Sequence, residues 1–529
     1  MKIMASISLK MLLLAAIIAI TLTAKAQAPA IQWQKCIGGS ASEQGFSIQL
    51  CSDGGYILAG SSQSIDSNII GNHGASDYLI VKLDSIGTTQ WQKCLGGSGF
   101  DVAQSIQQCS DGGYIVAGDS YSYDGDITNN HSYGYDDYWV VKLDTSGTIQ
   151  WQKSLGGSFN DYAYSIQQCT DGGYIVAGSS NSVNGDVTTH HNDSTTSDYW
   201  IVKLDAAGEI QWQKSFGGSD NDEALSIQQC NDGGYIVAGF SQSTDGDVTG
   251  NHGGHGDFWI LKLDATGTLI WQKCLGGSLG DVAFSIQQCS DGGYIAAGYT
   301  YSSNLNVSGN FGGDDYWVVK LSATGSLQWQ KCLGGGDADF AYSVQQCADG
   351  GFIVAGSSGS IDDEVTGNNG SQDYWVAKLD VSGNLQWQKC LGGISSDVAR
   401  SIQQCTDGGY ILFGTSNSPN GDVTGNHGNG DYWVVKLAAS ITPTSIAPIS
   451  ATQQVNIYPN PAKGLLTVKL TDKNPRTFTI TDIEGRIIKT VYITVNNSTI
   501  DISNLANGIY LLQHNDGLRS IADKFIINN

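Results

Sequence analysis

The sequence predicts an all-β protein, in which a seven-bladed β-propeller is followed by a small β-sandwich. The motif Trp-Gln-Lys recurs seven times at a nearly even spacing, beginning at Trp33, Trp91, Trp151, Trp212, Trp271, Trp329 and Trp387. Seven copies of Asp-Gly-Gly and seven of Asp-(Tyr/Phe)-(Trp/Leu) lie between these motifs. The chain from 455 to 529 follows a different pattern, without tryptophan or cysteine. Evenly spaced repeats of this kind are typical of propeller blades.

Each repeat has the pattern of four short strands, which we call A, B, C and D. In the second repeat they are Ser105–Gln108, Tyr114–Gly118, Asp137–Leu143 and Ile149–Lys153. These runs are rich in Val, Ile, Tyr and Trp, and Asp/Gly turns separate them, as expected for antiparallel strands.

The order of the strands along the chain predicts how the ring closes. The repeat region opens with a lone D strand, Ile31–Lys35, and ends with a complete A-B-C set whose last strand is Asp431–Leu437. We expect the first strand to pair with the last and so complete the seventh blade. A linear solenoid would instead need polar caps at its ends.

The loop between strands B and C, the B–C loop, is where the repeats differ in length. It is longest in the third repeat, and all the length variation of the repeats falls within it. Because successive strands alternate in direction, the B–C and D–A connections emerge on one face, the long-loop face. Variable loops tolerate insertions and often carry function, so we expect a protein or glycan ligand there.

Charge argues against several classes of partner. The chain of 529 residues has a net charge of −24, and residues 27–454 carry 15 basic and 44 acidic side chains. Such a body repels phosphate backbones, so we expect no nucleic-acid ligand.

The N-terminus has the pattern of a secretory signal peptide over residues 1–26. Lys2 and Lys10 accompany an apolar run, residues 11–22, and Ala24-Lys25-Ala26 offers a cleavage site. No other stretch is long and apolar enough for a membrane span. The sequence therefore predicts a protein that is exported, with cleavage near Ala26 and no membrane span in the mature chain.

The repeats resemble a known family. The predicted propeller spans residues 27–437. Over residues 31–437 the repeats, with Leu95-Gly-Gly-Ser, Asp111-Gly-Gly-Tyr-Ile-Val-Ala-Gly and Tyr138-Trp-Val-Val-Lys-Leu, are similar to those of bacterial seven-bladed propellers. This resemblance implies a fold and an extracellular setting, but no reaction.

Residues 438–454 form a predicted Ser/Thr/Pro linker, and residues 455–529 a separate domain. Strands are predicted at residues 465–470, 477–481, 486–490, 499–502 and 509–513, a pattern that suits a β-sandwich.

This C-terminal segment resembles the type A C-terminal sorting domain of the type IX secretion system of Gram-negative bacteria. The matching motifs are Ile457-Tyr-Pro-Asn-Pro, Ile483-Glu-Gly-Arg-Ile-Ile, Leu505-Ala-Asn-Gly-Ile-Tyr-Leu-Leu and Lys524-Phe-Ile-Ile. The resemblance implies that the type IX machinery recognises residues 455–529. It also implies that the protein is then attached to the outer surface or released.

The B–C loops hold oxygen ligands that suit calcium. Asp-Gly-Asp and Asn-Gly-Asp sequences place two oxygen ligands, carboxylate or amide, two residues apart on a glycine turn. The candidate calcium ligands are Asp124, Asp126, Asp186, Asp245, Asp247 and Asp422. The same residues also form simple Asx turns, so both interpretations stay open.

The twelve cysteines allow two interpretations. Seven end strand A and five follow strand D, and each of the five precedes a strand-A cysteine at one fixed spacing, as Cys36 precedes Cys51. Five disulfides would suit an exported protein. However, the paired positions fall at opposite ends of a strand, about 20 Å apart. We therefore favour small buried packing residues.

Two further residue types recur. Seven of the eight histidines lie in B–C loops, where we expect them to fill the loops rather than to bind metal. An acid follows each Gly-Gly, as Asp101 does, and seven similar copies favour a turn cap or a hydrogen bond between blades over catalysis.

These observations predict an exported binding or scaffold module without enzymatic activity. No His-Glu-x-x-His sequence or phosphate loop is present. One alternative is a secreted hydrolase or lyase that acts on polysaccharide with a site built from B–C loops. Another is a purely structural surface-display protein.

Overall fold

The computed structural model describes two parts of the chain. They are residues 27–439 without 132–133, 192–193 and 254, and residues 455–528 without 471–475, 483–485, 495–496 and 516–519. The chain divides into two compact units, Met1–Thr442 and Pro443–Asn529. The predicted signal peptide, and the predicted linker beyond Ala439, lie outside the described residues.

All regular elements of the described residues are β-strands, as predicted. None of these residues belongs to a helix that could cross a membrane.

The first unit contains seven four-stranded antiparallel sheets, which resemble the blades of a β-propeller. The A strands are β2 (Glu43–Leu50), β6 (Asp101–Gln108), β10 (Asp161–Gln168), β14 (Asp222–Gln229), β18 (Asp281–Gln288), β22 (Asp339–Gln346) and β26 (Asp397–Gln404). The B strands are β3 (Tyr56–Ser62), β7 (Tyr114–Ser120), β11 (Tyr174–Ser180), β15 (Tyr235–Ser241), β19 (Tyr294–Thr300), β23 (Phe352–Ser358) and β27 (Tyr410–Ser416).

The C and D strands complete the sheets. The C strands are β4 (Asp77–Leu83), β8 (Asp137–Leu143), β12 (Asp198–Leu204), β16 (Asp257–Leu263), β20 (Asp315–Leu321), β24 (Asp373–Leu379) and β28 (Asp431–Leu437). The D strands are β1 (Ile31–Ile37), β5 (Thr89–Leu95), β9 (Ile149–Leu155), β13 (Ile210–Phe216), β17 (Leu269–Leu275), β21 (Leu327–Leu333) and β25 (Leu385–Leu391).

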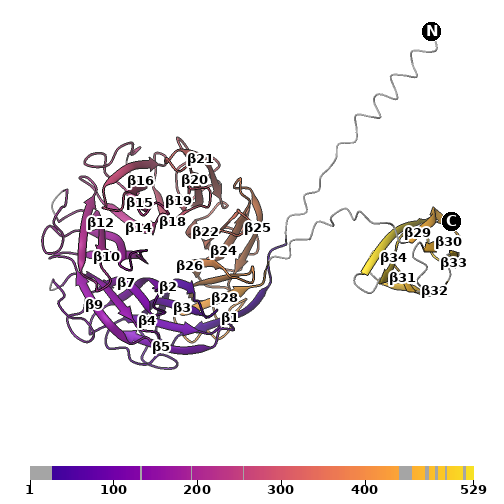
Figure 1. Cartoon of the computed structure of the whole chain (residues 1–529), viewed down its shortest axis with the longest axis horizontal. Coiled ribbons are helices and arrows are strands. Elements are labelled where there is room, and N and C mark those ends of the chain that lie inside the picture. The colour runs from indigo at the N-terminus through magenta and orange to yellow at the C-terminus, as the bar shows by residue number, and fades with distance from the viewer. Residues whose placement is uncertain are drawn as a thin grey trace, which may run out of the picture. The chain divides into compact units, whose positions relative to one another are not determined.

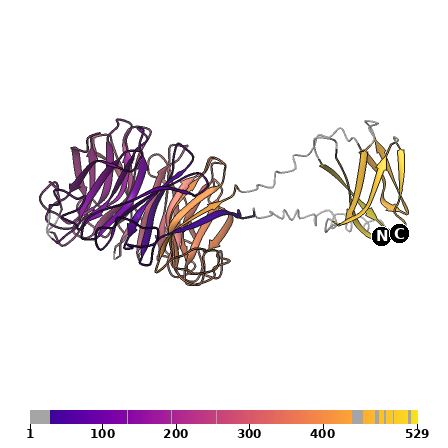
Figure 2. The same ribbon diagram turned by 90° about the horizontal axis from the view of Figure 1, so that it is seen from below.

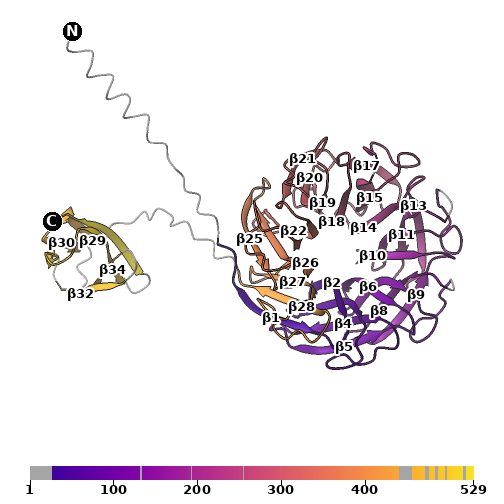
Figure 3. The ribbon, with the colours of Figure 1, turned by 180° about the vertical axis from the view of Figure 1, so that it is seen from behind.

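The sheets lie around a common axis, with the A strands innermost (Figure 1). Six sheets follow the chain in the order A-B-C-D, whereas the last has the order β1-β28-β27-β26. Its D strand is therefore β1, and Cys36 pairs with Trp433. Figure 3 shows indigo β1 beside orange β28.

Strand register places the long-loop face as expected. Asp101 at the start of β6 pairs with Ser120 at the end of β7, and Ser120 pairs with Asp137 at the start of β8. The start of strand A therefore lies beside the B–C loop. Figure 2 shows the strands from the side, with connections at their two ends.

The core lies between neighbouring sheets, and strand C forms its centre. Every residue of β8 is buried, including Trp139, whose indole N–H donates to Gln152 Oε1 at 2.8 Å. Each sheet shares one cluster of buried side chains with the next. Phe413 and Tyr432 of the last sheet belong to the same cluster as Leu58 of the first. Burial of such side chains contributes about 1.5–3 kcal/mol each.

The glycine of the Ala-Gly motif in strand B allows close packing. A Cβ atom on Gly118 would lie 1.9 Å from the carbonyl oxygen of Val102 and 2.8 Å from the hydroxyl oxygen of Tyr78 in the preceding sheet. Tyr78 instead donates a hydrogen bond to the Trp139 carbonyl at 3.0 Å. A side chain at Gly118 would therefore separate two sheets.

The face opposite the long loops is held by buried lysines. Lys142 on strand C is 3% exposed, and its ammonium group lies 2.8 Å from Asp111 of the Asp-Gly-Gly turn. It also donates to the carbonyl of Leu143 at 3.0 Å. The same arrangement recurs in all seven sheets.

Strand A differs from the prediction in length. It begins at Asp101 rather than Ser105, and a β-bulge lies between Ala103 and Ser105. The bulge leaves Gln104 outside the pairing and breaks the alternation that sequence analysis uses to recognise a strand.

The described residues of the second unit form seven strands. They are β29 (Val455–Lys463), β30 (Leu465–Leu470), β31 (Arg476–Asp482), β32 (Ile487–Ile493), β33 (Asn497–Asp501), β34 (Gly508–Asn515) and β35 (Ser520–Ile527). Their order is β32-β31-β34-β35-β29-β30-β33. Val468 of β30 and Phe478 of β31, the strands second from each end of this order, belong to one buried cluster. The sequence prediction lacked β29 and β35.

Candidate functional site

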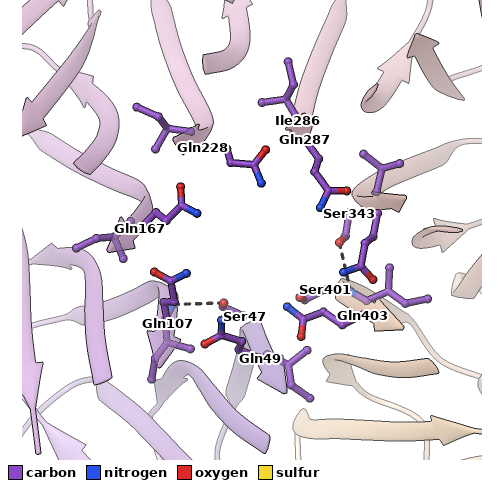
Figure 4. A pocket seen from close by; sticks show the side chains of 17 residues that line it. Ser47, Gln49, Gln107, Gln167, Gln228, Ile286, Gln287, Ser343, Ser401 and Gln403 are labelled. Atoms are coloured by element: carbon purple, nitrogen blue, oxygen red, sulfur yellow. Dashed lines mark hydrogen bonds between the residues drawn. The ribbon is translucent and has the colours of Figure 1, made fainter. Parts of the chain in front are cut away.

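Seven glutamines, one from each A strand, line a cavity on the axis (Figure 4). This glutamine ring consists of Gln49, Gln107, Gln167, Gln228, Gln287, Gln345 and Gln403, and the cavity has a volume of about 240 Å³. Gln107 Oε1 accepts the main-chain N–H of Gln168 in the next sheet at 2.6 Å. Gln403 of the last sheet accepts from Leu50 of the first at 2.9 Å.

The amide N–H groups of the glutamine ring face the cavity on the axis. Each Oε1 is occupied by an N–H group of the next sheet. None of these seven Nε2 groups donates a hydrogen bond to another described residue. The channel therefore presents a ring of amide donors to any polar group that enters it.

A second cavity, of about 320 Å³, is lined by the residue three positions before each of these glutamines. We call this set the mouth ring. It consists of Phe46, Gln104, Tyr164, Leu225, Phe284, Tyr342 and Arg400. Strand A starts on the long-loop face, so the mouth ring lies nearer that face than the glutamine ring does. Unlike the glutamine ring, it carries five residue types.

Aromatic side chains form one side of the mouth. Phe284 and Tyr342 have ring centroids 4.8 Å apart, and Phe340 lies against both Tyr342 and Tyr299. The Arg400 guanidinium carbon lies 3.9 Å from the Tyr342 ring centroid and 5.8 Å from that of Phe46. These are cation–π distances.

Acids lie on the other side. The Tyr164 hydroxyl donates to Glu223 Oε2 at 3.4 Å, and burial raises the pKa of Glu223. Burial also raises the pKa of Asp119 well above its ordinary value, against a hydrogen bond from Gln104 that lowers it. The mouth is therefore asymmetric, with the guanidinium group near the last sheet and these carboxyl groups near the second and fourth.

The predicted calcium ligands are all on the long-loop face, where they hold the D–A connection. Asp124 Oδ1 accepts the N–H of Ser98 at 2.7 Å, and Asp126 Oδ2 that of Gly96 at 3.2 Å. Equivalent bonds are made by Asp186, Asp245, Asp247 and Asp422. The described residues contain no group of three or more His, Cys, Asp or Glu arranged to hold a metal ion. Calcium would have to replace these N–H groups, and calcium binding stays a prediction.

Five loop histidines anchor their B–C loop to the start of strand C. His73, His131, His191, His252 and His427 each place Nδ1 within 2.5–3.0 Å of the carboxylate of the strand-C aspartate. Two of them also reach the next sheet's loop: His131 Nε2 is 3.5 Å from Asp186 Oδ2, and His191 Nε2 is 3.1 Å from Asp247 Oδ2. Sequence analysis gave them a packing role only.

The acid at the start of strand A is a turn cap, one of the two expected roles. Asp101 accepts hydrogen bonds from the Gly97 N–H at 2.9 Å and the Ser122 hydroxyl at 2.8 Å. A Cβ atom on Gly96 would lie 2.5 Å from Asp101 Oδ2 and 2.8 Å from Asp77 Oδ1 of the preceding sheet. Two buried carboxyl groups thus face Gly96 from consecutive sheets, and burial raises the pKa of Asp101 to about 6.

All twelve cysteines are free and buried, as the packing interpretation predicts. Burial raises the pKa of Cys109 to about 11 and that of Cys94 to about 12. Thiols of this kind are poor nucleophiles and poor metal ligands at neutral pH.

Sequence analysis missed the mouth ring because it concentrated on what the repeats share. A signal was present. Aligning the repeats on the strand-A acid shows an invariant Gln six residues later and a variable residue three residues later. Variation at one inward position of an otherwise repeated strand indicates a site.

Comparison with known proteins covers parts of the chain. A Caulobacter vibrioides protein described as regulatory protein FlaEY is 30% identical over 169 residues, which are 31% of this chain and 17% of that protein. The chain thus spans less than a fifth of the length of this relative.

Two solved structures are similar at low identity. PorZ, described as an essential bacterial surface component of the type-IX secretion system of Porphyromonas gingivalis, has a TM-score of 0.40 at 12% identity and covers 93% of this chain and 60% of PorZ. The Neurospora crassa Pan2 WD40 domain has a TM-score of 0.42 at 12% identity, over 76% of this chain and 95% of the domain. TM-scores this low support no statement about the function of this chain.

The second unit has the clearest relationship. Residues 456–528 match the family model of the secretion system C-terminal sorting domain. This match agrees with the motifs of the tail and with its seven-stranded unit, and it indicates a secreted or outer-surface protein that the type IX secretion machinery handles. The chain therefore ends in a secretion system C-terminal sorting domain.

Proposed function

We propose that the first unit is a closed seven-bladed β-propeller that acts as an exported binding module, with its ligand site at the mouth of the central channel. Support for a closed ring comes from the β1–β28 pairing and from the core that the last sheet shares with the first. A closed ring leaves no unpaired seam and holds its axis rigidly.

The contrast between the two rings carries the proposal. Both rings come from equivalent positions of the same seven strands. The glutamine ring is uniform because each glutamine bonds the next sheet. The mouth ring makes no such repeated bond, and its residues instead combine aromatic groups, a guanidinium group and an amide around a cavity of about 320 Å³. A concave site with apolar walls and a few polar groups is typical of ligand binding.

The site lies on the long-loop face, where the B–C loops also vary in length. The proposed ligand is a glycan or a protein segment, and binding requires no catalysis. The secreted hydrolase or lyase remains the alternative from another class. Its group for proton transfer would be Glu223, whose raised pKa suits a general acid. Purely structural display predicts no ligand at the mouth.

A screen of the full-length protein on glycan and peptide arrays tests the proposal. The first variant is Gln104→Trp, which fills the mouth at a position where four other sheets carry Phe or Tyr. The matched control, Thr145→Trp, adds the same side chain to an exposed turn on the opposite face. We expect binding that Gln104→Trp weakens about tenfold or more and that the control leaves unchanged.

Three results would decide against this assignment. Binding that persists in Gln104→Trp would move the site away from the mouth. Absence of binding to either array would favour structural display. Release of shortened products from bound glycans, analysed by mass spectrometry, would favour the enzyme.

A further inference from the structure

The chemistry of the ligand follows from Arg400, and this step rests on the binding function proposed above. Arg400 lies on the innermost strand β26, at the bulge between Ala399 and Ser401, and lines the mouth cavity. It is the only arginine between residues 27 and 437. In a region so rich in acidic side chains, one arginine on the axis is a specific feature of the last sheet.

Arg400 has no carboxylate partner among the described residues. Its guanidinium group is stacked at 3.9 Å on Tyr342 and approaches Phe46 at 5.8 Å. Stacking occupies the faces of the planar group and leaves its N–H donors at the edge. These donors line the mouth cavity, where water or a ligand can accept from them. An anionic group with two oxygens fits that edge best, because a carboxylate accepts two parallel hydrogen bonds.

The innermost strands argue against an extended peptide. Their main-chain N–H groups are already occupied by side chains of the preceding sheet: Ile106 donates to Ser47 Oγ at 3.3 Å, and Gln168 to Gln107 Oε1 at 2.6 Å. A peptide that adds itself as a strand needs a free strand edge, and the channel offers none at these positions.

A sugar fits the remaining groups. The face of a pyranose ring carries C–H groups that pack on aromatic side chains such as Phe284 and Tyr342. Its hydroxyl oxygens can accept from the unoccupied amide groups of the glutamine ring, which lies next along the axis. The mouth cavity of about 320 Å³ lies at the lower end of the range of small-ligand pockets, so it admits only the end of a chain.

We propose that the mouth binds the terminal hexuronic acid of a glycan chain, with the sugar carboxylate on Arg400 and the sugar ring against the aromatic wall. The site takes a single carboxylate, because one guanidinium group cannot offset a polyanion near a body with so many acids. The affinity therefore resides in the chain end and does not grow with the number of uronic acids.

Calorimetric titration of the full-length protein with trigalacturonate tests this inference. The comparison ligands are its methyl ester and the neutral trisaccharide cellotriose, and all titrations contain EDTA so that bound calcium plays no part. The main variant is Arg400→Gln, which introduces the residue that Gln104 provides in the second sheet. The matched control is Lys389→Gln, which removes the same charge from the outer strand β25.

We expect trigalacturonate to bind at least about tenfold more tightly than its ester, since a bidentate charged contact has that effect. Arg400→Gln should abolish this preference, and Lys389→Gln should keep it. Equal binding of acid and ester, or a preference that survives Arg400→Gln, overturns the inference about the carboxylate. If that binding is still lost in Gln104→Trp, the proposed function stands.

A second arm separates glycan from peptide. An acetylated tripeptide with a free C-terminal carboxylate is compared with its amide. Binding of the peptide acid through Arg400, without binding of trigalacturonate, overturns the assignment to a sugar. Absence of binding by every probe in the wild-type protein, together with negative arrays, contradicts the proposed function itself.

Discussion

The hydroxyl group of Tyr432 in the last sheet donates a hydrogen bond to the main-chain carbonyl oxygen of Leu79 in the first sheet, at 2.8 Å. The two residues lie near opposite ends of the repeat region, yet the bond repeats one made between neighbouring sheets, such as that from Tyr138 to Trp200 at 2.9 Å. The interface between the last and first sheets is thus built like the others. One interface differs: Phe258 replaces the tyrosine, and its ring packs on Trp317 without a hydroxyl group.

Adding the missing hydroxyl should stabilise the protein. Phe258→Tyr is expected to raise the free energy of unfolding by about 1 kcal/mol, because a buried hydrogen bond contributes about that amount. The matched control, Tyr138→Phe, should lower it by a similar amount. Urea unfolding followed by tryptophan fluorescence measures both. A loss of stability in Phe258→Tyr would show that this interface cannot accommodate the bond.

Removing β1 tests the closure of the ring. Deletion of residues 27–37 is expected to expose β28 as an edge strand and to leave the cluster around Trp433 without Cys36. The variant should aggregate or be digested rapidly by a protease, whereas the wild-type protein resists. Size-exclusion chromatography and limited proteolysis measure this. A monomeric, protease-resistant variant would contradict closure by the N-terminal strand.

Stability should increase as the pH falls from 7.5 to 5. Burial raises the pKa of Asp161 and Asp315 to about 7 and of Asp222 to about 6. A raised carboxyl pKa means that the folded state holds a proton that the unfolded state has released. The stability is then complete below the unfolded pKa near 4 and is lost as the pH rises towards 7. Calorimetric melting curves at several pH values measure the trend.

Asp315 and Asp257 provide matched variants for this trend. Asp257 has the His252 partner at its carboxylate, whereas Phe311 occupies that place beside Asp315. Asp315→Asn should therefore stabilise the protein by about 1–2 kcal/mol at pH 7.5 and have a smaller effect at pH 5. Asp257→Asn should destabilise it at both pH values, because it weakens the histidine contact. Equal behaviour of the two variants would refute this account.

Calcium binding predicts a rise in the melting temperature. If the Asp-Gly-Asp loops bind calcium, millimolar Ca²⁺ added after chelator treatment should stabilise the protein by about 2.7 kcal/mol at 100 times the dissociation constant. The double variant Asp124→Asn and Asp126→Asn should reduce the effect. The fifth sheet, with Asn304 and Asn306 at these positions, should contribute least. An unchanged melting temperature would leave the loops as turns.

Because all twelve cysteines are free in the structure, we expect twelve reactive thiols in the unfolded protein. Labelling under denaturing, non-reducing conditions, followed by mass spectrometry, should modify every cysteine of the chain. A count of two would instead support the five-disulfide alternative.

Much of the fold could be predicted because the same strand and turn motifs recur in each of the seven repeats. The Asp-Gly-Gly turns and the C strands, such as Asp137–Leu143, are found where the sequence places them. In the tail, β30 spans the predicted residues, whereas β29 was missed because Pro459 and Pro461 interrupt a strand pattern.

The candidate site was harder to predict, because it depends on contacts between repeats. Arg400 and Tyr342 come from consecutive repeats, and only the bulge in each A strand turns both towards the axis. The contact of His131 with Asp186 of the next sheet has the same origin. To predict such contacts, one must know the angle between adjacent sheets, and no local sequence pattern gives that angle.

The place of β1 has a mechanical consequence. Ala438, just after β28, donates its main-chain N–H to Ala30, just before β1, at 2.9 Å. A pull on the chain beyond Ala438 therefore acts on a strand that has hydrogen-bonded neighbours on both sides, β27 and β1. Such a strand must break two ladders at once under load, whereas an edge strand would peel away from one. A protein tethered through its C-terminal segment would thus be held by an interior strand, and flow or shear at a cell surface would load a strand of the last sheet that is secured on both sides.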